Sequence, residues 1–149
     1  MDIQETIKLK GRIKLALFDA SGKEKETREI DNVIVTVGKT YLAAWLAAAS
    51  QAGYWMQYIG LGEGINAANA SDTTLQTPLA TRVAGTLSSA TNVWQNVALF
   101  GPAVDTGAIT EAGIFSAASG GTLMARQVFA VINKGAGDSL SVTWQITLS

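Results

Sequence analysis

Three glycines at alternate positions are the first feature of this chain that could carry chemistry. They are Gly60, Gly62 and Gly64, in the segment YIGLGEG. A dinucleotide-binding fingerprint needs its third glycine one position later, followed at once by a helix. Ile65 occupies that position, and the polar segment NAANAS follows. No Gly-Lys-Ser/Thr ends the loop, so the Walker pattern fails as well. We interpret these glycines as a strand exit that needs a positive φ or a close backbone approach.

Carboxylates are the next candidates, as general acids or metal ligands. The part of the chain after residue 53 contains Glu63, Asp72, Asp105, Glu111 and Asp138. Four of these lie in polar loops, where turn and capping roles are typical, and Asp72 is one of them. Glu111 lies inside the apolar segment ITEAGIF. A half-buried carboxylate needs a cationic partner or backbone donors. We therefore predict a structural ion pair between Glu111 and either Arg82 or Arg126.

The chain contains no cysteine and no histidine. Thiol nucleophiles, Cys–His pairs, Ser–His–Asp triads and nearly all zinc sites are thereby excluded. We expect no catalytic residue, no metal and no cofactor, and a protein that is not an enzyme.

Aromatic side chains could form a sugar-stacking platform, or they could fill the core and an interface. We expect Trp45 and Trp144 to lie in the core. The segment YWMQY has aromatic side chains on both faces of a strand, so one face is expected to meet another element or subunit. The aromatic interface candidates are Tyr54, Trp55, Tyr58 and Trp94.

Charged residues are concentrated near the N-terminus. Residues 1–39 hold eight Lys/Arg and seven Asp/Glu, whereas residues 40–149 hold only three and five. A soluble domain usually has about 25% charged residues, and interface cores are depleted in Lys, Glu and Asp. The charge-poor part is therefore expected to be uncharged polar surface or to be covered by other subunits. The net charge of −1 argues against a nucleic-acid partner.

The length of 149 residues fits a single domain, 1–149, that needs no disulfide or metal for stability. The apolar segment YLAAWLAAA is too short to span a bilayer, so no membrane partner is expected. The first residues, MDIQETIKLK, lack the apolar region of a secretory signal.

Residues 11–36 are expected to form a charged hairpin with a turn at 20–23. Ile13, Leu15 and Leu17 alternate with residues of the other face, which is the period of a half-buried strand. Residues 1–10 are expected to form an extended arm that gains order on a neighbouring molecule. Its apolar residues complete the predicted interface: Met1, Ile3, Ile7 and Leu9.

A helix is predicted over residues 38–50, because apolar residues recur on one of its faces. These residues are Tyr41, Leu42, Trp45, Leu46 and Ala49.

Residues 54–149 favour an antiparallel β-sandwich or barrel-like domain, since turn signals recur every 8 to 12 residues or so. A strand at 54–61 leads to the glycines, and a polar loop follows with one helical turn from Ser71. The last strand alternates Leu140, Val142, Trp144, Ile146 and Leu148 inward. The further strands are predicted at 82–90, 92–100, 109–117, 122–133 and 139–149. The fold class is therefore mainly β, with one inserted helix.

The order of features over about residues 32–149 resembles tailed-phage virion proteins, above all the tail-collar and tail-fibre type domain. The shared pattern is a glycine-rich strand exit, a Ser-Asp-Thr-x-Leu loop, an arginine, an acid before Gly-Ile-Phe, and a closing strand. The motifs are turns and packing positions. The matching residues are Gly60, Gly62, Gly64, Ser71, Asp72, Thr73, Leu75, Arg82, Glu111, Gly113, Phe115, Gly121, Leu123 and Asp138.

The resemblance implies a virion structural protein that is made in the host cytoplasm. Fibre proteins carry this module in a much longer chain, whereas here a charged hairpin is added before it and the chain ends on its last strand. A small stand-alone chain is more similar to a capsid cement (decoration) protein at capsomer junctions. Its partners would be the major capsid protein and copies of itself, as a trimer or another small symmetric oligomer. The alternative is a tail, neck or fibre-adaptor protein that contacts tail or neck proteins.

Overall fold

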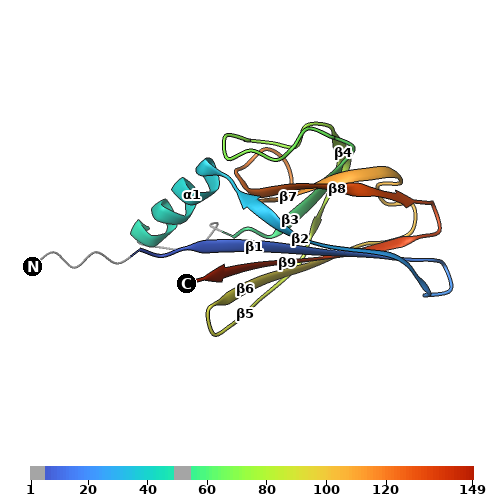
Figure 1. The fold of residues 1–149 in the computed structure, drawn as a ribbon, viewed down its shortest axis with the longest axis horizontal. Helices are drawn as coiled ribbons and strands as arrows, with labels where there is room; N and C mark the ends of the chain where they lie inside the picture. The colour runs from blue at the N-terminus through green and yellow to red at the C-terminus, as the bar shows by residue number, and fades with distance from the viewer. Residues whose placement is uncertain (1–5, 49–54) are drawn as a thin grey trace, which may run out of the picture.

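The computed structural model describes residues 6–48 and 55–149. Within these residues nine antiparallel strands form a nearly closed barrel, and one short helix follows the N-terminal hairpin (Figure 1). The predicted fold class is confirmed. The elements are β1 (Leu9–Phe18), β2 (Glu24–Ile34), α1 (Thr36–Ala47), β3 (Tyr58–Gly62), β4 (Pro78–Ala84), β5 (Thr86–Ala90), β6 (Val93–Phe100), β7 (Gly107–Phe115), β8 (Leu123–Lys134) and β9 (Ser139–Leu148).

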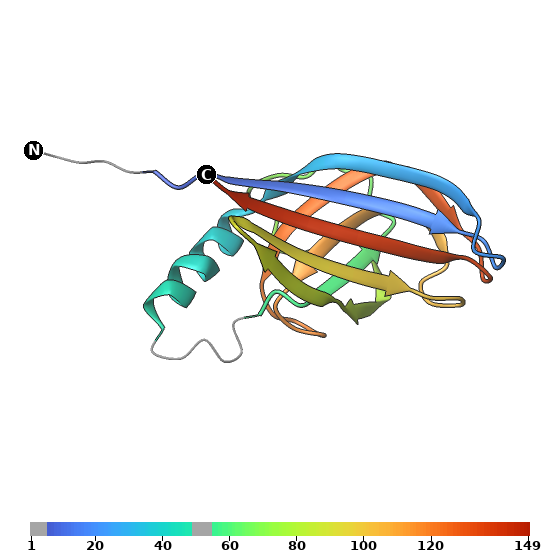
Figure 2. The same cartoon turned by 90° about the horizontal axis from the view of Figure 1, so that it is seen from below.

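The hairpin is an integral part of the barrel and not an addition to it. The strand order is β4-β3-β7-β8-β2-β1-β9-β6-β5, so β1 and β2 lie in the middle of the sheet. The first strand, β1, pairs with the last strand, β9, along its whole length (Figure 2). The sequence could not show this, because the partner of β1 is more than 120 residues away along the chain.

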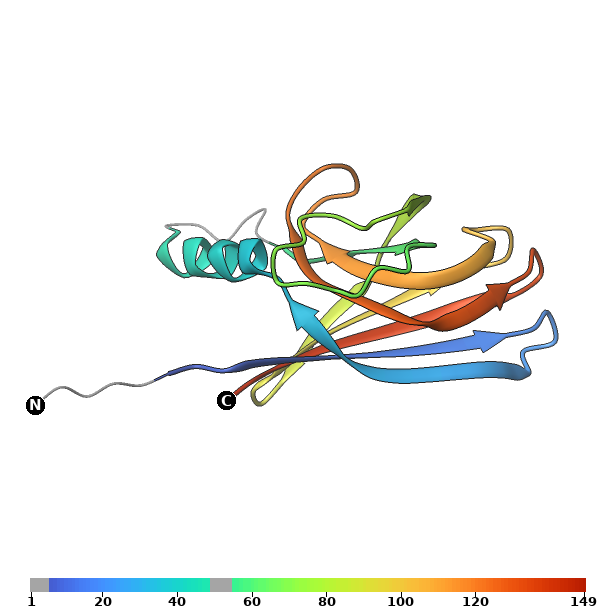
Figure 3. The same cartoon turned by 45° about the horizontal axis from the view of Figure 1, so that its top comes forward.

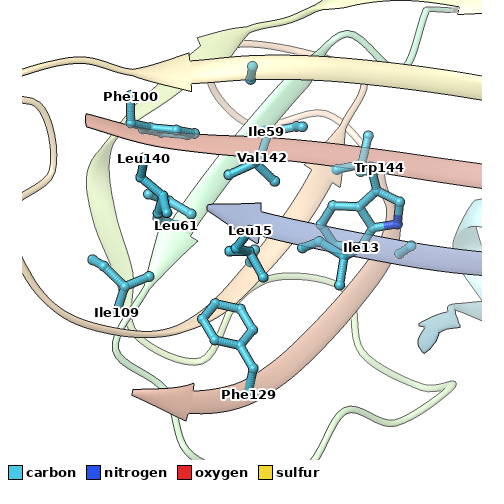
Figure 4. Close-up of a cluster of buried hydrophobic side chains, with 14 of the residues drawn as sticks. Ile13, Leu15, Ile59, Leu61, Phe100, Ile109, Phe129, Leu140, Val142 and Trp144 are labelled. Atoms are coloured by element: carbon cyan, nitrogen blue, oxygen red, sulfur yellow. The ribbon is translucent and has the colours of Figure 1, made fainter. Parts of the chain in front are cut away.

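The core fills the inside of the barrel, and its β1 and β9 side chains follow the predicted alternation. Ile13 and Leu15 of β1 and Val142 and Trp144 of β9 are completely buried (Figure 4). The buried indole Nε1–H of Trp144 donates a hydrogen bond to Asn32 Oδ1 at 3.0 Å, as a buried tryptophan requires. The alternation ends at the edge of the barrel, since Leu148 is 37% exposed.

The helix α1 is fixed to the barrel mainly through its first turn. A side chain at Gly38 would place its Cβ 2.5 Å from Met124 O, so only glycine allows this approach. Just before the helix, Val35 N donates to Met124 O at 3.1 Å. The helix begins two residues and ends three residues earlier than predicted. Leu46, predicted on the packed face, is 69% exposed, and Ala49 lies outside the described residues.

Three local predictions differ from the structure. The first residues of the strand expected at 54–61 that the structure describes are not in a strand, and β3 begins at Tyr58. The strand expected at 82–90 is two strands, β4 and β5, on either side of Gly85. The helical turn from Ser71 is absent among the described residues, because Ser71 N and Oγ instead donate to Asn69 Oδ1 at 2.9 and 2.8 Å.

In the part of the chain that the structure describes, no helix has the length and apolar character needed to cross a membrane.

The barrel has a seam between β4 and β5, the two ends of the sheet. Gly85 N donates to Gln57 O at 2.8 Å, and Asn96 of β6 reaches across the seam. Its Nδ2 donates to Met56 O and Gln57 O, each at 3.0 Å. A side chain on Gly85 would overlap Asn96. The buried amide of Asn96 thus takes the place of a missing strand pair.

Replacing Asn96 with Leu should destabilise the barrel by about 2 to 3 kcal/mol, because two buried carbonyl groups lose their donor. Urea unfolding followed by tryptophan fluorescence measures this loss. Ser88→Ala on the exposed face of β5 is the control and should change stability by less than about 0.5 kcal/mol. Equal stability of the two variants would contradict the role assigned to Asn96.

Candidate functional site

Figure 3 shows the end of the barrel where α1 lies, which we call the mouth. An apolar pocket lies at this end. The pocket has a volume of about 380 Å³, within the range of roughly 300 to 1,000 Å³ that is usual for binding pockets. We call it the mouth pocket. The described residues that line it are Leu9, Tyr41, Leu42, Trp45, Trp55, Met56, Leu87, Trp94, Met124, Ile146 and Leu148.

Strand register and the helix together position this lining. Leu9 of β1 lies opposite Leu148 of β9, and Trp94 of β6 lies opposite Ile146 of β9. Directly opposite residues on one face of a sheet have adjacent side chains. The helix contributes Tyr41, Leu42 and Trp45, which are neighbours on one helical face. The closest approach of α1 to the barrel is at Gly38, and Tyr41 and Leu42 then pack against the core while they line the mouth pocket.

The chemistry of the mouth pocket is that of apolar binding. Among the described residues that line it there is no carboxylate, amine or amide side chain. A sugar requires several hydrogen bonds from its site, and this lining supplies few donors or acceptors. Apolar cavities also hold water poorly. The mouth pocket therefore suits an apolar side chain or chain segment better than a glycan.

The predicted interface residues fall into three groups. Leu9, Trp55 and Trp94 line the mouth pocket. Ile7, two residues before Leu9 in the sequence, is 69% exposed. Tyr58 lies elsewhere and packs against a separate small cluster formed by Val35, Leu75, Phe115 and Leu123. The remaining three residues lie outside the described residues: Met1, Ile3 and Tyr54.

Sequence reasoning missed part of this lining. Trp45 was predicted in the core, but it is only half-buried and lines the mouth pocket. The predicted apolar face of the helix placed Tyr41, Leu42 and Trp45 on one surface, but it did not show that this surface lines a pocket. Nothing local marks Met56, Leu87 or Met124, because the barrel topology alone brings them to the mouth. Their assignment needs the strand order.

Glu111 is the best-connected ionisable side chain in the described structure. It is completely buried, and Arg126 Nε donates to its Oε2 at 2.8 Å. Its two oxygens also accept backbone N–H groups at 2.7 to 3.1 Å. Such a buried carboxylate is compensated by a cation and by backbone donors together. The backbone donors are Gly64, Gln76 and Thr77.

The Glu111 network ties the polar loop 63–77 to the outside of the barrel. Arg126 Nη1 donates to Asp72 Oδ2 at 2.8 Å, and its Nη2 donates to Asn66 O at 3.0 Å. Burial alone lowers the pKa of Arg126, but its hydrogen bonds to Asp72 and Glu111 outweigh that effect, and the pKa is raised. The hydrogen bonds of Glu111 and Arg126 hold the 63–77 loop in place, and we assign this network a structural role.

The three glycines of the YIGLGEG segment are explained by close approach. A Cβ on Gly62 or Gly64 would lie 2.5 Å from Glu111 Oε1. Gly60 leaves room for the side chains of Arg82 and Phe115, which would lie 3.3 Å from an added Cβ. None of the three has a positive φ. Glycine is thus needed so that the carboxylate of Glu111 can reach the backbone.

Arg82 is not a partner of Glu111. Its Nη1 donates to Ala117 O at 2.9 Å and to Gly120 O at 2.6 Å. Its guanidinium carbon lies 3.5 Å from the centre of the Phe115 ring, a cation–π contact. Burial lowers the pKa of Arg82. This arginine fixes the β7–β8 loop, and Arg126 alone completes the predicted ion pair.

The opposite end of the barrel is polar. Lys25 Nζ lies 2.9 Å from Asp138 Oδ2. The hydrogen bonds from Lys25 and from Gly135 N hold the pKa of Asp138 below its ordinary value. Lys134 is buried, donates to Gly101 O at 2.9 Å, and has its pKa lowered by burial. No group of three or more acidic side chains that could hold a metal ion occurs in residues 6–48 and 55–149.

Comparison of the chain with protein-family models, with curated proteins and with solved structures finds no match in any of the three.

Glu111→Ala should destabilise the protein by about 3 to 5 kcal/mol, because it leaves Arg126 and backbone donors buried without their acceptor. Chemical denaturation measures the difference. The matched control is Glu29→Ala, which removes the exposed partner of Arg12 at 2.9 Å and should cost only about 0 to 1 kcal/mol. Similar losses in the two variants would refute the structural role of the network.

The Lys25–Asp138 pair should make stability depend on acid pH. Since the folded-state pKa of Asp138 lies below the ordinary 3.8, the pair stabilises the protein above that value and the contribution is lost as pH falls through the folded pKa. The melting temperature of Asp138→Asn should therefore lie below that of the native chain at neutral pH. The gap should narrow as the pH is lowered towards 2. A gap of constant size at all pH values would contradict this assignment.

Proposed function

We propose that this chain is a structural protein of a tailed-bacteriophage virion and that it works as a cement protein on the capsid surface. It would bind the major capsid protein at capsomer junctions and stabilise the head. The resemblance of residues 32–149 to virion proteins suggests the class. The observation that carries the proposal is the scarcity of charge on the barrel outside the hairpin.

Burial makes this scarcity greater than the composition suggests. Residues 40–149 contain eight Lys, Arg, Asp and Glu residues. Four of them are buried, three more are half-buried, and Glu63 alone is exposed. The buried four are Arg126, Lys134, Glu111 and Asp138.

Such a surface supports broad protein contact. An interface core that contains no Lys, Glu or Asp avoids most of the cost of removing charges from water. The hairpin has the opposite character, with exposed pairs such as Lys10–Asp31 at 3.6 Å and Arg12–Glu29 at 2.9 Å. We infer that the hairpin faces solvent in the assembled particle and that the uncharged barrel wall contacts the capsid.

The proposal predicts that the chain is present in purified particles of the phage that encodes it, in a copy number comparable with that of the capsid protein. Stained gels and quantitative mass spectrometry measure this ratio. Particles made without the gene should lose their DNA at a lower temperature, and adding back the purified chain should restore their heat resistance.

Two other outcomes have a clear meaning. A few copies per particle would reject the cement role in favour of a tail, neck or fibre-adaptor protein, the position of the domain it resembles. Complete absence from purified particles would reject the virion role itself.

A further inference from the structure

The mouth of the barrel exposes an unusual concentration of large apolar side chains. Eight large apolar side chains are exposed among the described residues, and five of them belong to α1, to the lining of the mouth pocket, or to the segment just before β1. Patches of this kind mark interaction surfaces in soluble proteins. The five residues are Ile7, Val37, Leu46, Trp55 and Leu148.

Ile7 projects from this surface, and the mouth pocket is a hole in the same surface. Leu9 lines the pocket, and Lys8 still pairs with Ser149 through two backbone hydrogen bonds at 2.6 and 2.9 Å. The described start of the chain lies just beyond the C-terminus, outside the barrel (Figure 2). Ile7 is 69% exposed, so it does not fill the pocket of its own molecule.

Residues 6–10, the described start of the chain, contain neither glycine nor proline, the residues that most often reverse a chain. Ile7 has the same strand parity as Leu9 and Ile13, whose side chains point toward the pocket and the core. Its side chain is therefore suited to an apolar hole in a second molecule.

We propose that the mouth pocket binds Ile7 of a second copy of this chain, in a two-fold dimer whose mouths face each other. A two-fold axis requires a self-complementary surface, and this surface carries both the projecting side chain and its pocket. The axis places two Ile7 side chains into two pockets. The exposed apolar groups of α1 then cover each other around them.

The apolar character of the mouth pocket fits a second copy as the occupant. The mouth pocket has no Lys, Arg, Asp or Glu in its described lining, so seating Ile7 there removes no charged group of the lining from water. Lys8 and Lys39 lie beside the mouth pocket and are exposed.

The absence of cysteine from the chain allows a direct test with single-cysteine variants. An Ile7→Cys chain is mixed with a longer, tagged Leu87→Cys chain and oxidised. Leu87 lines the mouth pocket. The expected product is a disulfide-linked heterodimer of intermediate size on a non-reducing gel. Ala20→Cys, in the hairpin turn at the far end of β1, replaces Ile7→Cys as the control and should give no such heterodimer.

Light scattering of the purified chain tests the same contact without cross-linking. The native chain should be a dimer, and Ile7→Asp should raise the dimer dissociation constant by about 100-fold or more, since two apolar side chains lose their burial. Thr6→Asp changes the opposite face of the same segment and should leave the dimer intact. Circular dichroism should show both variants folded, because residues 6 and 7 are exposed.

Several results would overturn the proposal. A monomeric native chain, or a dimer that Ile7→Asp does not weaken, would exclude this contact. A disulfide that forms within one molecule of the Ile7→Cys/Leu87→Cys double variant would mean that the pocket holds its own arm. A fatty acid that binds the native chain and Ile7→Asp with equal affinity would favour a small apolar ligand. The test uses the isolated chain, so its result is independent of the copy number in virions.

Discussion

The antiparallel pairing of the first strand with the last determines most of this structure. The ladder runs from Leu9 opposite Leu148 to Phe18 opposite Ser139 without a break. Because side chains alternate along a strand, this register directs the apolar residues of both strands into the barrel, and a slip of one residue would direct Arg12 and Lys14 inward instead. The barrel cannot close until the end of the chain is available, which is the kind of long-range contact that slows folding.

The same pairing creates the mouth. It brings the start of β1 and the end of β9 together, and it places Leu9 and Leu148 beside the Trp94–Ile146 pair of the neighbouring strands. The helix follows the hairpin directly, and its first turn approaches Met124 most closely at Gly38. An apolar pocket results because strand register sets one wall and a helix anchored at its first turn sets the other. In residues 6–48 and 55–149, no helix lies beside the polar opposite end.

Local patterns predicted what depends on neighbouring residues, and they failed where distant residues decide. The alternation in β1 and β9 identified Ile13, Leu15, Val142 and Trp144 as core residues, and all four are buried. The place of the hairpin in the middle of the sheet is set by β9, which no local pattern reveals. The same holds for Glu111: its apolar surroundings predicted an arginine partner. Only the pairing of β7 with β8, in which Gly113 lies opposite Arg126, brings Arg126 within reach.

The internal use of charge explains why so little remains on the outside. Arg126 and Glu111 hold the 63–77 loop, and Lys134 and Asp138 fix the loops at the polar end. Each of these four charged groups is compensated by hydrogen bonds inside the chain. None of them therefore adds exposed charge to the barrel wall that would repel other proteins. Among the described residues, dense exposed charge lies on the hairpin, where the Lys10–Asp31 and Arg12–Glu29 pairs join the two strands. A chain built in this way has one strongly hydrated face, an uncharged wall and an apolar mouth. The uncharged wall and the apolar mouth both lower the desolvation cost of association. Because they are different surfaces, the proposed contact with the capsid and the proposed contact with a second copy do not compete.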